Sequence, residues 1–429
     1  MKKLVVGLSP TTNILNMKSE IKILAPAGNW ESLRAGINAG ADEIYFGIGE
    51  LNMRAAGANN FSINDLKKIG LLCKKARVKS WVTLNTVVYD EEIEEIKNIL
   101  KEIKKAKITG IIASDLAVIK MANEKKIEVC VSTQMSVSNL ETIKFLSKWV
   151  DRIVLARELN LEQIKKITEG IKLKKIKGPK RKLIEIEVFG HGAMCVGISG
   201  RCQMSLFHNN LSANRGKCVQ MCRRKYEVTE IRSSIVDDRS SKEITEKMIL
   251  DNNLIMSRSD LCTIGLLDKL AESGISTIKI EGRARSADYV DTVVRVYKKA
   301  LNLISENKYN KSNKEKLLEE LKTVFNRGFS SGFYLGRSVE EWAVGENNLA
   351  TEKKILLGKI EHYYPKVEVA QIKLTTKDRV QNGYKYIIIG QISGVIRGQF
   401  NDIKMDGNVL TFKVNQKVRK GDNLFLIKK

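Results

Sequence analysis

The sequence predicts an α/β chain: a (β/α)8 TIM-like barrel followed by a small all-β barrel. Two observations indicate this fold. From about residue 21 to 290, short β-rich runs alternate with amphipathic stretches of helical spacing. From about residue 354 the runs become β-rich and glycine-containing turns become frequent. Eight strand-like runs favour a closed barrel over a doubly wound open sheet, which has the same local pattern.

The eight expected strands are residues 21–25, 43–46, 79–84, 110–113, 128–131, 152–155, 184–188 and 277–281. Residues 64–75 and 91–105, which lie between strands, have the apolar spacing of helices. Asn29 follows the first strand and is expected to cap the first helix.

The regular repeat is interrupted between the seventh and eighth strands. About 85 residues separate them, far more than an ordinary βα connection. The loop after strand seven of a barrel leaves from the C-terminal face, where active sites lie. We therefore expect four parts: an N-terminal extension (1–20), a barrel (21–300) whose Cys-rich insertion (190–262) caps its mouth, a helical connector (301–350) and a C-terminal β-barrel (351–429). Residues 287–307 and 317–325 are expected to be helical.

Four cysteines in the insertion, Cys195, Cys202, Cys218 and Cys222, follow the spacing C-x6-C-x15-C-x3-C. The segment from Cys195 to Tyr226 contains six Lys or Arg and no Asp or Glu, and nearby cations lower thiol pKa values. The pattern indicates a metal or iron–sulfur site. It lacks the C-x2-C pairs that zinc ribbons favour, whereas iron–sulfur clusters accept irregular spacing; zinc and structural or redox thiols remain alternatives.

The other three cysteines, Cys73, Cys130 and Cys262, lie at apolar positions and are expected to be buried structural residues. Cys262 follows Asp260, which we interpret as a helix cap.

Polar residues follow most of the expected strands, and in a barrel they would form a ring at the mouth. Arginines there could clamp carboxylate or phosphate groups, or form structural ion pairs. A histidine there could contact substrate, support a cluster or be structural. The ring comprises Arg54, Asn85, Asp115, Ser132, Gln134, Arg157, Glu158, His191, Glu281 and Arg283.

The net charge is strongly positive, +25 from 74 Lys and Arg against 49 Asp and Glu. Such a surplus favours a polyanionic partner, with RNA or DNA first and an anionic membrane second, unless it reflects a lysine-rich composition alone. The basic run 172–182 is expected to be a solvated connection on the opposite face of the barrel.

Several classes of protein are disfavoured. No apolar run reaches the roughly 18 residues of a membrane-spanning helix, and the apolar stretch at the N-terminus is shorter than a signal-peptide core. We expect a cytoplasmic protein without a membrane partner; its oligomeric state is not predicted. No GxGxxG, P-loop, HExxH or GxSxG motif occurs.

Five segments match a known family in the same order. Residues 188–202, VFGHGAMCVGISGRC, closely resemble the signature of the collagenase-like peptidase family, number thirty-two of the unknown catalytic type. Residues 214–228, NRGKCVQMCRRKYEV, resemble its second cysteine pair. Residues 23–47 and 278–290 resemble its first βα unit and its last barrel strand. Residues 325–337, FNRGFSSGFYLGR, resemble the segment after the barrel in the tRNA-hydroxylating branch.

The resemblance implies a function that composition alone does not. Better-understood members hydroxylate tRNA wobble uridine, ribosomal RNA cytidine or a quinone precursor, and some depend on prephenate. They carry an iron–sulfur cluster, which we expect here as a 4Fe-4S cluster on Cys195, Cys202, Cys218 and Cys222. We therefore expect 5-hydroxylation of a tRNA uridine, with tRNA or another RNA as partner and prephenate as co-substrate.

Two other functions remain open: a peptidase, as the family name states, and a non-catalytic RNA-binding protein with a structural metal. For the hydroxylase, the candidate catalytic residues are His191, Glu281, Arg283, Arg157 and Glu158. The candidates for binding a cofactor are Arg54, Asn85 and Gln134.

Overall fold

The computed structural model describes residues 21–226, 254–336, 342–343, 345, 348–376, 378 and 380–428. The expected N-terminal extension (1–20), residues 227–253 of the expected insertion and part of the expected connector (337–341) lie outside the described residues. No helix in the described ranges is long and apolar enough to cross a membrane.

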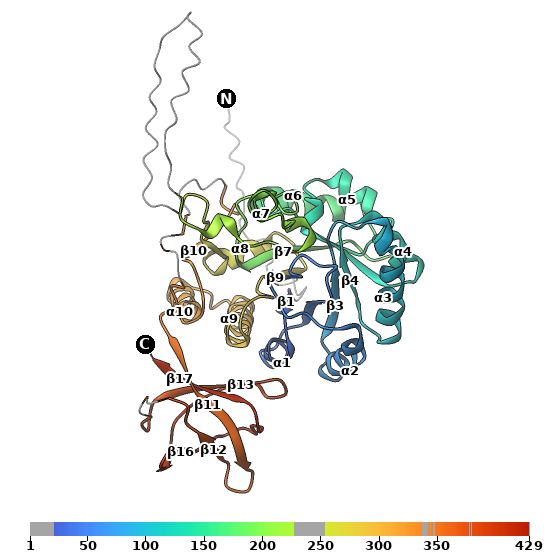
Figure 1. Cartoon of the computed structure of the whole chain (residues 1–429). Helices are drawn as coiled ribbons and strands as arrows, with labels where there is room; N and C mark the ends of the chain where they lie inside the picture. The colour runs from blue at the N-terminus through green and yellow to red at the C-terminus, as the bar shows by residue number, and fades with distance from the viewer. Residues whose placement is uncertain are drawn as a thin grey trace, which may run out of the picture.

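Eight parallel strands form the closed barrel that the sequence predicts (Figure 1). Each strand pairs with the next along the chain, and β9 pairs with both β7 and β1, which closes the ring. The barrel strands are β1 (Lys22–Ala27), β2 (Glu43–Gly47), β3 (Lys79–Leu84), β4 (Gly110–Ala113), β5 (Glu128–Val131), β6 (Arg152–Val154), β7 (Glu185–Gly192) and β9 (Thr277–Ile280).

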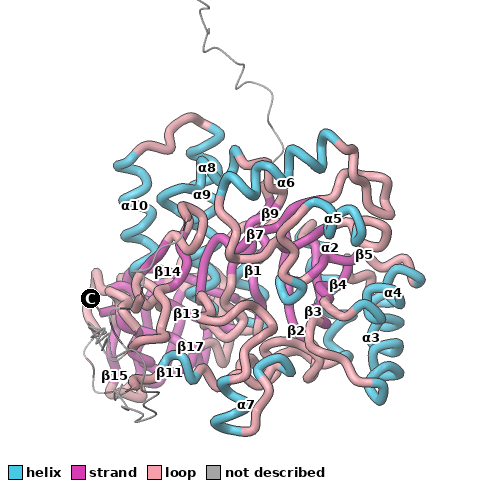
Figure 2. Tube along the Cα trace, turned by 90° about the horizontal axis from the view of Figure 1, so that it is seen from above, coloured by secondary structure: helices cyan, strands magenta, loops and turns pink. Residues whose placement is uncertain are grey.

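Helices surround the ring of strands, as the view from above in Figure 2 shows. Because both faces of a parallel strand are covered, strands such as β4, with the sequence GIIA, are buried throughout. In α3, Ile96, Ile99 and Ile103 point inward at helical spacing. Asn29 caps α1 by accepting a hydrogen bond from the Ser32 amide at 2.8 Å, as expected. The outer helices are α1 (Trp30–Asn38), α2 (Leu66–Ala76), α3 (Ile93–Lys105), α4 (Leu116–Glu124), α5 (Leu140–Leu146), α6 (Leu161–Leu173), α8 (Leu267–Glu272) and α9 (Ala287–Ser305).

Near the N-terminal ends of its strands, the barrel holds a buried network of charges around Arg152. This guanidinium, fully buried, donates to Glu43 Oε1 at 2.9 Å and to Glu185 Oε2 at 2.6 Å. Glu187 Oε2 lies 3.4 Å from Arg152 Nη1, and Trp81 Nε1 donates to Glu43 at 2.7 Å. Burial alone would raise the pKa of Glu43, but the hydrogen bond and charge of Arg152 lower it. The network is therefore ionised and compensated.

Two short strands that the sequence analysis missed extend the sheet, one in the insertion after β7 and one in the expected connector (301–350). β8 (Asp260–Cys262) pairs antiparallel with the end of β7, and β10 (Phe329–Ser330) pairs with β8. The interpretation of Asp260 as a helix cap is wrong, because this residue begins β8. The insertion also contains α7 (Met204–Asn209) and two short 3-10 turns, Ala213–Arg215 and Met221–Arg223. Cys73, Cys130 and Cys262 are buried, as expected.

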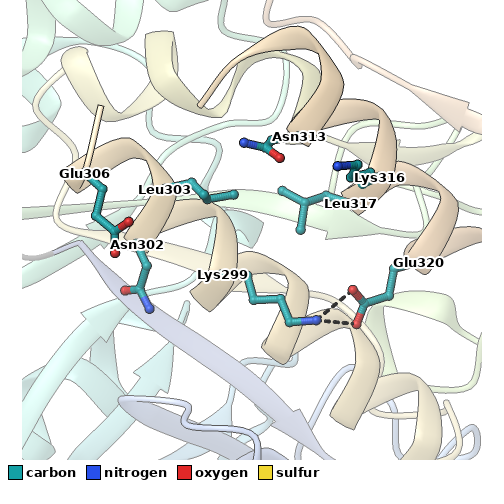
Figure 3. Close-up of a pocket in the computed structure, with 8 residues that line it drawn as sticks. All are labelled: Lys299, Asn302, Leu303, Glu306, Asn313, Lys316, Leu317 and Glu320. Carbon is teal, nitrogen blue, oxygen red and sulfur yellow. Dashed lines mark hydrogen bonds and ion pairs between the residues drawn. The ribbon is translucent and has the colours of Figure 1, made fainter. Parts of the chain in front are cut away.

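The segment after the barrel forms α10 (Lys311–Lys322). This helix overlaps the expected helix 317–325, but it begins six residues earlier and ends three residues earlier. Its first turn is capped by Asn310, and it packs along α9 through Leu317 and Leu321. A surface cavity of about 400 Å³ lies between the two helices (Figure 3). Its edge carries the ion pair of Lys299 with Glu320, 2.8 Å long, and no candidate site residue lines it.

The C-terminal part is an antiparallel sheet of seven strands with a hydrophobic core of its own. It lies beside α1 and α9 (Figure 1), and Arg397 Nε reaches Asp291 Oδ2 of α9 at 3.1 Å. The strand order is β14-β13-β17-β11-β12-β16-β15. The bounds are β11 (Lys353–Tyr364), β12 (Val369–Lys373), β13 (Lys385–Gly390), β14 (Gly394–Gln399), β15 (Lys404–Asp406), β16 (Val409–Lys413) and β17 (Asn423–Lys428).

Most of the basic run 172–182 is an exposed connection between α6 and β7, as expected, although its first two residues end α6. Lys174 and Lys180 form ion pairs with Glu141 and Glu128. Two of its lysines are therefore paired with acids on the barrel surface.

Candidate functional site at the barrel mouth

A cavity of about 140 Å³ lies at the C-terminal ends of the barrel strands, under the insertion. Its wall combines strand-end residues with the cysteine segment, two parts of the chain that are distant in sequence. The candidate residues that line it are Arg54, Asn85, Gln134, Arg157, Cys195, Cys202, Cys218, Cys222, Glu281 and Arg283. Ser132 of the expected polar ring also lines it.

Two glycines explain how the insertion closes against the barrel. Gly216 has φ +79°, and a side chain there would meet the Asn52 carbonyl oxygen at 2.2 Å. Its own carbonyl accepts a hydrogen bond from the Ala56 amide at 3.2 Å, in the loop after β2. Gly200, with φ +77°, lies equally close to the Gln134 side chain. Residues without a β-carbon thus allow the backbone of the insertion to seal the mouth.

All four clustered cysteines are free thiols; Cys195 is exposed and the other three are half-buried. The Ser205 hydroxyl lies 4.0 Å from the Cys218 sulfur and accepts a hydrogen bond from the Val219 amide. The described residues contain no group of three or more His, Cys, Asp or Glu side chains already arranged around one metal ion. The donor set itself, four free thiols on the wall of one cavity, is chemically suited to an iron–sulfur cluster or to zinc.

Two basic residues of the insertion pair with acids of the barrel instead of compensating the thiols. Arg215 pairs with Glu92, 2.9 Å from Nη1 to Oε2, and Lys217 lies 3.6 Å from Glu50. Loops of the barrel therefore supply the acids that the insertion lacks. Burial raises the pKa of the Cys222 thiol, and the other cysteines add to this against the charge of Arg223. The expected lowering of thiol pKa is wrong for Cys222.

Arg54 and Glu281 form an ion pair at the cavity wall, with Nη2 and Oε1 3.1 Å apart. Burial alone would raise the pKa of Glu281, but Arg54, Arg285 and Arg157 lower it. Glu281 therefore stays a carboxylate, and it neutralises Arg54. This arrangement makes Glu281 an acceptor of hydrogen bonds rather than an acid.

Arg283 is buried with neutral partners. Its guanidinium donates to Thr83 Oγ1 at 2.7 Å, to Asn60 Oδ1 at 2.9 Å and to Asn52 Oδ1. Among the described residues no carboxylate lies within ion-pair distance of it, and Nε has no hydrogen-bond partner. Burial lowers the pKa of Arg283 to about 10, so the group remains a cation at neutral pH. An uncompensated buried cation on a cavity wall favours an anionic ligand.

Three more buried polar atoms on the same wall have no partner among the described residues: Arg157 Nε, Gln134 Oε1 and Asn214 Oδ1. Arg157 is held by its Nη1, which donates to the Ala193 carbonyl at 3.0 Å, and its guanidinium stacks 3.8 Å from the Phe189 ring. Asn85 donates to Ser132 Oγ at 3.1 Å. The wall therefore presents both donors and acceptors to a polar ligand.

Lys279 is a site residue that the sequence analysis missed. It projects from β9 into the barrel, where Nζ pairs with Glu187 Oε1 at 3.1 Å and lies 4.4 Å from the centre of the Tyr45 ring. Lys279 lines the cavity and connects it to the network around Arg152. A lysine inside an otherwise apolar strand was the signal that could have indicated it.

Three candidates do not line the cavity. His191 lies inside β7, which is longer than expected, and is buried among the rings of Tyr289, Tyr297 and Phe329. Burial lowers its pKa to about 3, so it is neutral. Glu158 is exposed, and Asp115 caps α4 by accepting from the Ala117 amide at 2.8 Å. The structure thus gives Asp115 a capping position and leaves catalytic roles for His191 and Glu158 as predictions.

The fold and this cavity define a TIM-like barrel protein in which a four-cysteine insertion covers the C-terminal ends of the barrel strands. The chain belongs to peptidase family U32, whose family model matches residues 28–343.

Relatives in this family carry two kinds of name. A protein named collagenase from Porphyromonas gingivalis is 41% identical over 416 residues, which covers 95% of this chain and 98% of the relative. An uncharacterized protease of Methanocaldococcus jannaschii is 34% identical, over 95% of this chain and 98% of the relative. The tRNA hydroxylation protein P1 of Bacillus subtilis is 34% identical, over 76% of this chain and 74% of the relative.

Proposed function

We propose that this protein is an RNA-modifying oxidoreductase that places a hydroxyl group on C5 of a tRNA uridine. The observation that carries the proposal is the composition of the mouth cavity, where four free thiols meet a buried arginine that lacks an anionic partner. The relative named tRNA hydroxylation protein supports tRNA as the substrate class, and the net charge of +25 suits a polyanion.

In this proposal Cys195, Cys202, Cys218 and Cys222 hold a 4Fe-4S cluster, with zinc as the alternative metal. A cluster there would supply electron transfer or a Lewis-acidic anchor for the hydroxyl donor. Their common position on one cavity, without a disulfide among them, supports the assignment.

The residues of the chain then bind and orient the co-substrate. Prephenate carries two carboxylates, and the free donor atoms of Arg283 and Arg157 are suited to them. Arg54 is held by Glu281 and contributes position rather than net charge. The Gln134 and Asn214 carbonyl oxygens can accept hydrogen bonds from hydroxyl or imide N–H groups.

Mass spectrometry of tRNA nucleosides tests the proposal. A deletion strain should lack 5-hydroxyuridine derivatives, and the parent gene should restore them. Cys202→Ala should fail to restore them, whereas Cys73→Ala, a change at a buried thiol far from the insertion in sequence, should succeed. Unchanged hydroxyuridine derivatives in the deletion strain would remove tRNA hydroxylation as the function.

A peptidase is the second candidate, because the relative named collagenase matches nearly the whole chain, the C-terminal part included. Peptide hydrolysis needs an activated nucleophile and a site for the oxyanion. Arg283 could serve as the latter, and Glu281 is the carboxylate that lines the cavity. Cleavage of a collagen-like peptide by iron-free protein, with loss of cleavage in Glu281→Gln, would establish this alternative.

A further inference from the structure

The C-terminal sheet has one face that is not used for packing against the barrel. Strands β13 and β14 face α1 and α9, and Ile387 and Val395 of these strands join the core of the barrel. Strands β12 and β16 lie on the side of the domain away from the barrel (Figure 1). Their inward residues, such as Ile372 and Phe412, fill the core of the domain.

The strand register identifies the outward residues of β11, β12, β16 and β15. His362 stands opposite Gln371, which stands opposite Thr411, which stands opposite Lys404. Parallel rows on either side complete this outer face. It comprises His362, Tyr364, Val369, Gln371, Lys373, Lys404, Val409, Thr411, Lys413 and one acid, Asp406, which stands opposite Val409.

Two exposed aromatic side chains lie at one edge of the outer face. The rings of His362 and Tyr364 are 4.3 Å apart, and Tyr364 is 41% exposed although its hydroxyl is hydrogen-bonded to Gln371 at 2.9 Å. This bond restrains a ring that remains exposed. Fixed, exposed rings on a sheet are the surface on which unpaired bases stack.

The charge of the domain is complementary to a nucleic acid. Residues 351–429 contain sixteen Lys or Arg against seven Asp or Glu, a net charge of +9. On the outer face Lys373 and Lys404 are exposed and form no ion pair within the described part of the chain. Lys413 is paired with Asp402 at 3.0 Å. Lysines interleaved with aromatic rings are typical of surfaces that follow a single strand.

We propose that this outer face binds single-stranded RNA, so that the protein holds its RNA at a second place besides the barrel mouth. The proposal rests on the proposed function for the identity of the RNA as substrate. Bases stack on Tyr364 and His362, while Lys373 and Lys404 contact phosphates.

Fluorescence anisotropy with a fluorescein-labelled, uridine-rich single-stranded RNA and the full-length protein tests this. The double variant His362→Ala/Tyr364→Ala should bind about tenfold more weakly, because one or two stacked bases are lost. Lys373→Gln/Lys404→Gln should reduce the slope of log K against log salt by about 1.4, since each phosphate contact contributes about 0.7. The control Lys101→Gln/Lys104→Gln, on the exposed face of α3, should change the slope little.

Binding by the outer-face variants equal to that of the parent, or no RNA binding by the parent, would overturn the inference. If the outer-face variants lose binding to vesicles of anionic phospholipid while their RNA binding is unchanged, the inference is also overturned and the face binds a membrane surface.

The nucleoside assay distinguishes failure of this inference from failure of the proposed function. If the deletion strain loses hydroxyuridine while the face variants bind RNA normally, only this inference fails; if the variants lose RNA binding while hydroxyuridine persists without the gene, only the proposed function fails.

Discussion

The barrel buries two arginines in opposite ways. Arg152, near the N-terminal ends of the strands, is surrounded by three carboxylates. Burial alone would lower its pKa, but the carboxylates hold the pKa above the ordinary value. Arg283, at the mouth, has only neutral acceptors, and burial lowers its pKa to about 10. The first cation is compensated within the protein and stabilises the fold. The second has no ion-pair partner among the described residues, and the charge of Glu281 acts on it only from a greater distance. An anion bound in the cavity would supply that partner, which is the property of a ligand site.

The largest effect is expected at the compensated arginine. Arg152→Met leaves the buried carboxylate of Glu43 without its cation and removes one of the two cations beside Glu187, so the free energy of unfolding should fall by about 3–5 kcal/mol. Urea denaturation measures the change. Lys104→Met on the exposed face of α3 is the control. A loss below about 1 kcal/mol at Arg152 would show that the network does not stabilise the fold.

The next effect separates function from stability. Arg283→Met removes hydrogen bonds to neutral acceptors only, so the free energy of unfolding should fall by about 1–2 kcal/mol. Modification of tRNA should fall about 10- to 100-fold, because a charged hydrogen bond to a ligand contributes roughly 1.5–3 kcal/mol.

Both quantities are measured on the same variant, by urea denaturation and by nucleoside mass spectrometry in the complemented strain. Equal loss of stability at Arg283 and Arg152, with modification intact at Arg283, would reverse the roles that we assign to the two ends of the barrel.

The smallest effect concerns acid stability. Burial would raise the pKa of Glu185, but Arg152 and Lys22 lower it to about 2. A carboxylate whose pKa is lower in the folded state stabilises the protein above its unfolded pKa of about 4.3. This stabilisation is lost as the pH falls from about 4.5 to 2.

In Glu185→Gln the urea midpoint should therefore decrease less between pH 5 and pH 3 than in the parent. Glu162→Gln, at an exposed pair with Lys166, should follow the parent, because such pairs contribute little. Identical acid sensitivity of the parent and Glu185→Gln would contradict the lowered pKa of Glu185 in the folded protein.

Local sequence patterns predicted most of the barrel because its strands are short, largely apolar runs and its helices have clear apolar spacing. They did not predict β8 and β10, since strands of two or three residues carry almost no periodic signal. β8 pairs with β7, and β10 pairs with β8. In the C-terminal part, β-rich runs indicated β12, β13, β16 and β17, whereas β11, β14 and β15 were not predicted.

The site was predicted in part. Arg54, Asn85 and Gln134 end strands or begin the loops after them, so barrel topology brings them to the mouth. The partners of Arg152 and Arg283 come from strands distant in sequence, and no local pattern distinguishes a compensated arginine from an uncompensated one. His191 was expected at a strand end and is the last residue but one of β7, where the pairing with β8 and β9 extends this strand beyond its expected length.

Metal analysis after anaerobic purification tests the central claim, that the four-cysteine mouth is a cofactor site, most directly. The protein as isolated should contain about four irons and four sulfides per chain, and Cys202→Ala should lose most of both while Cys73→Ala retains them. One zinc per chain with no iron, or equal iron in the two variants, would contradict the claim.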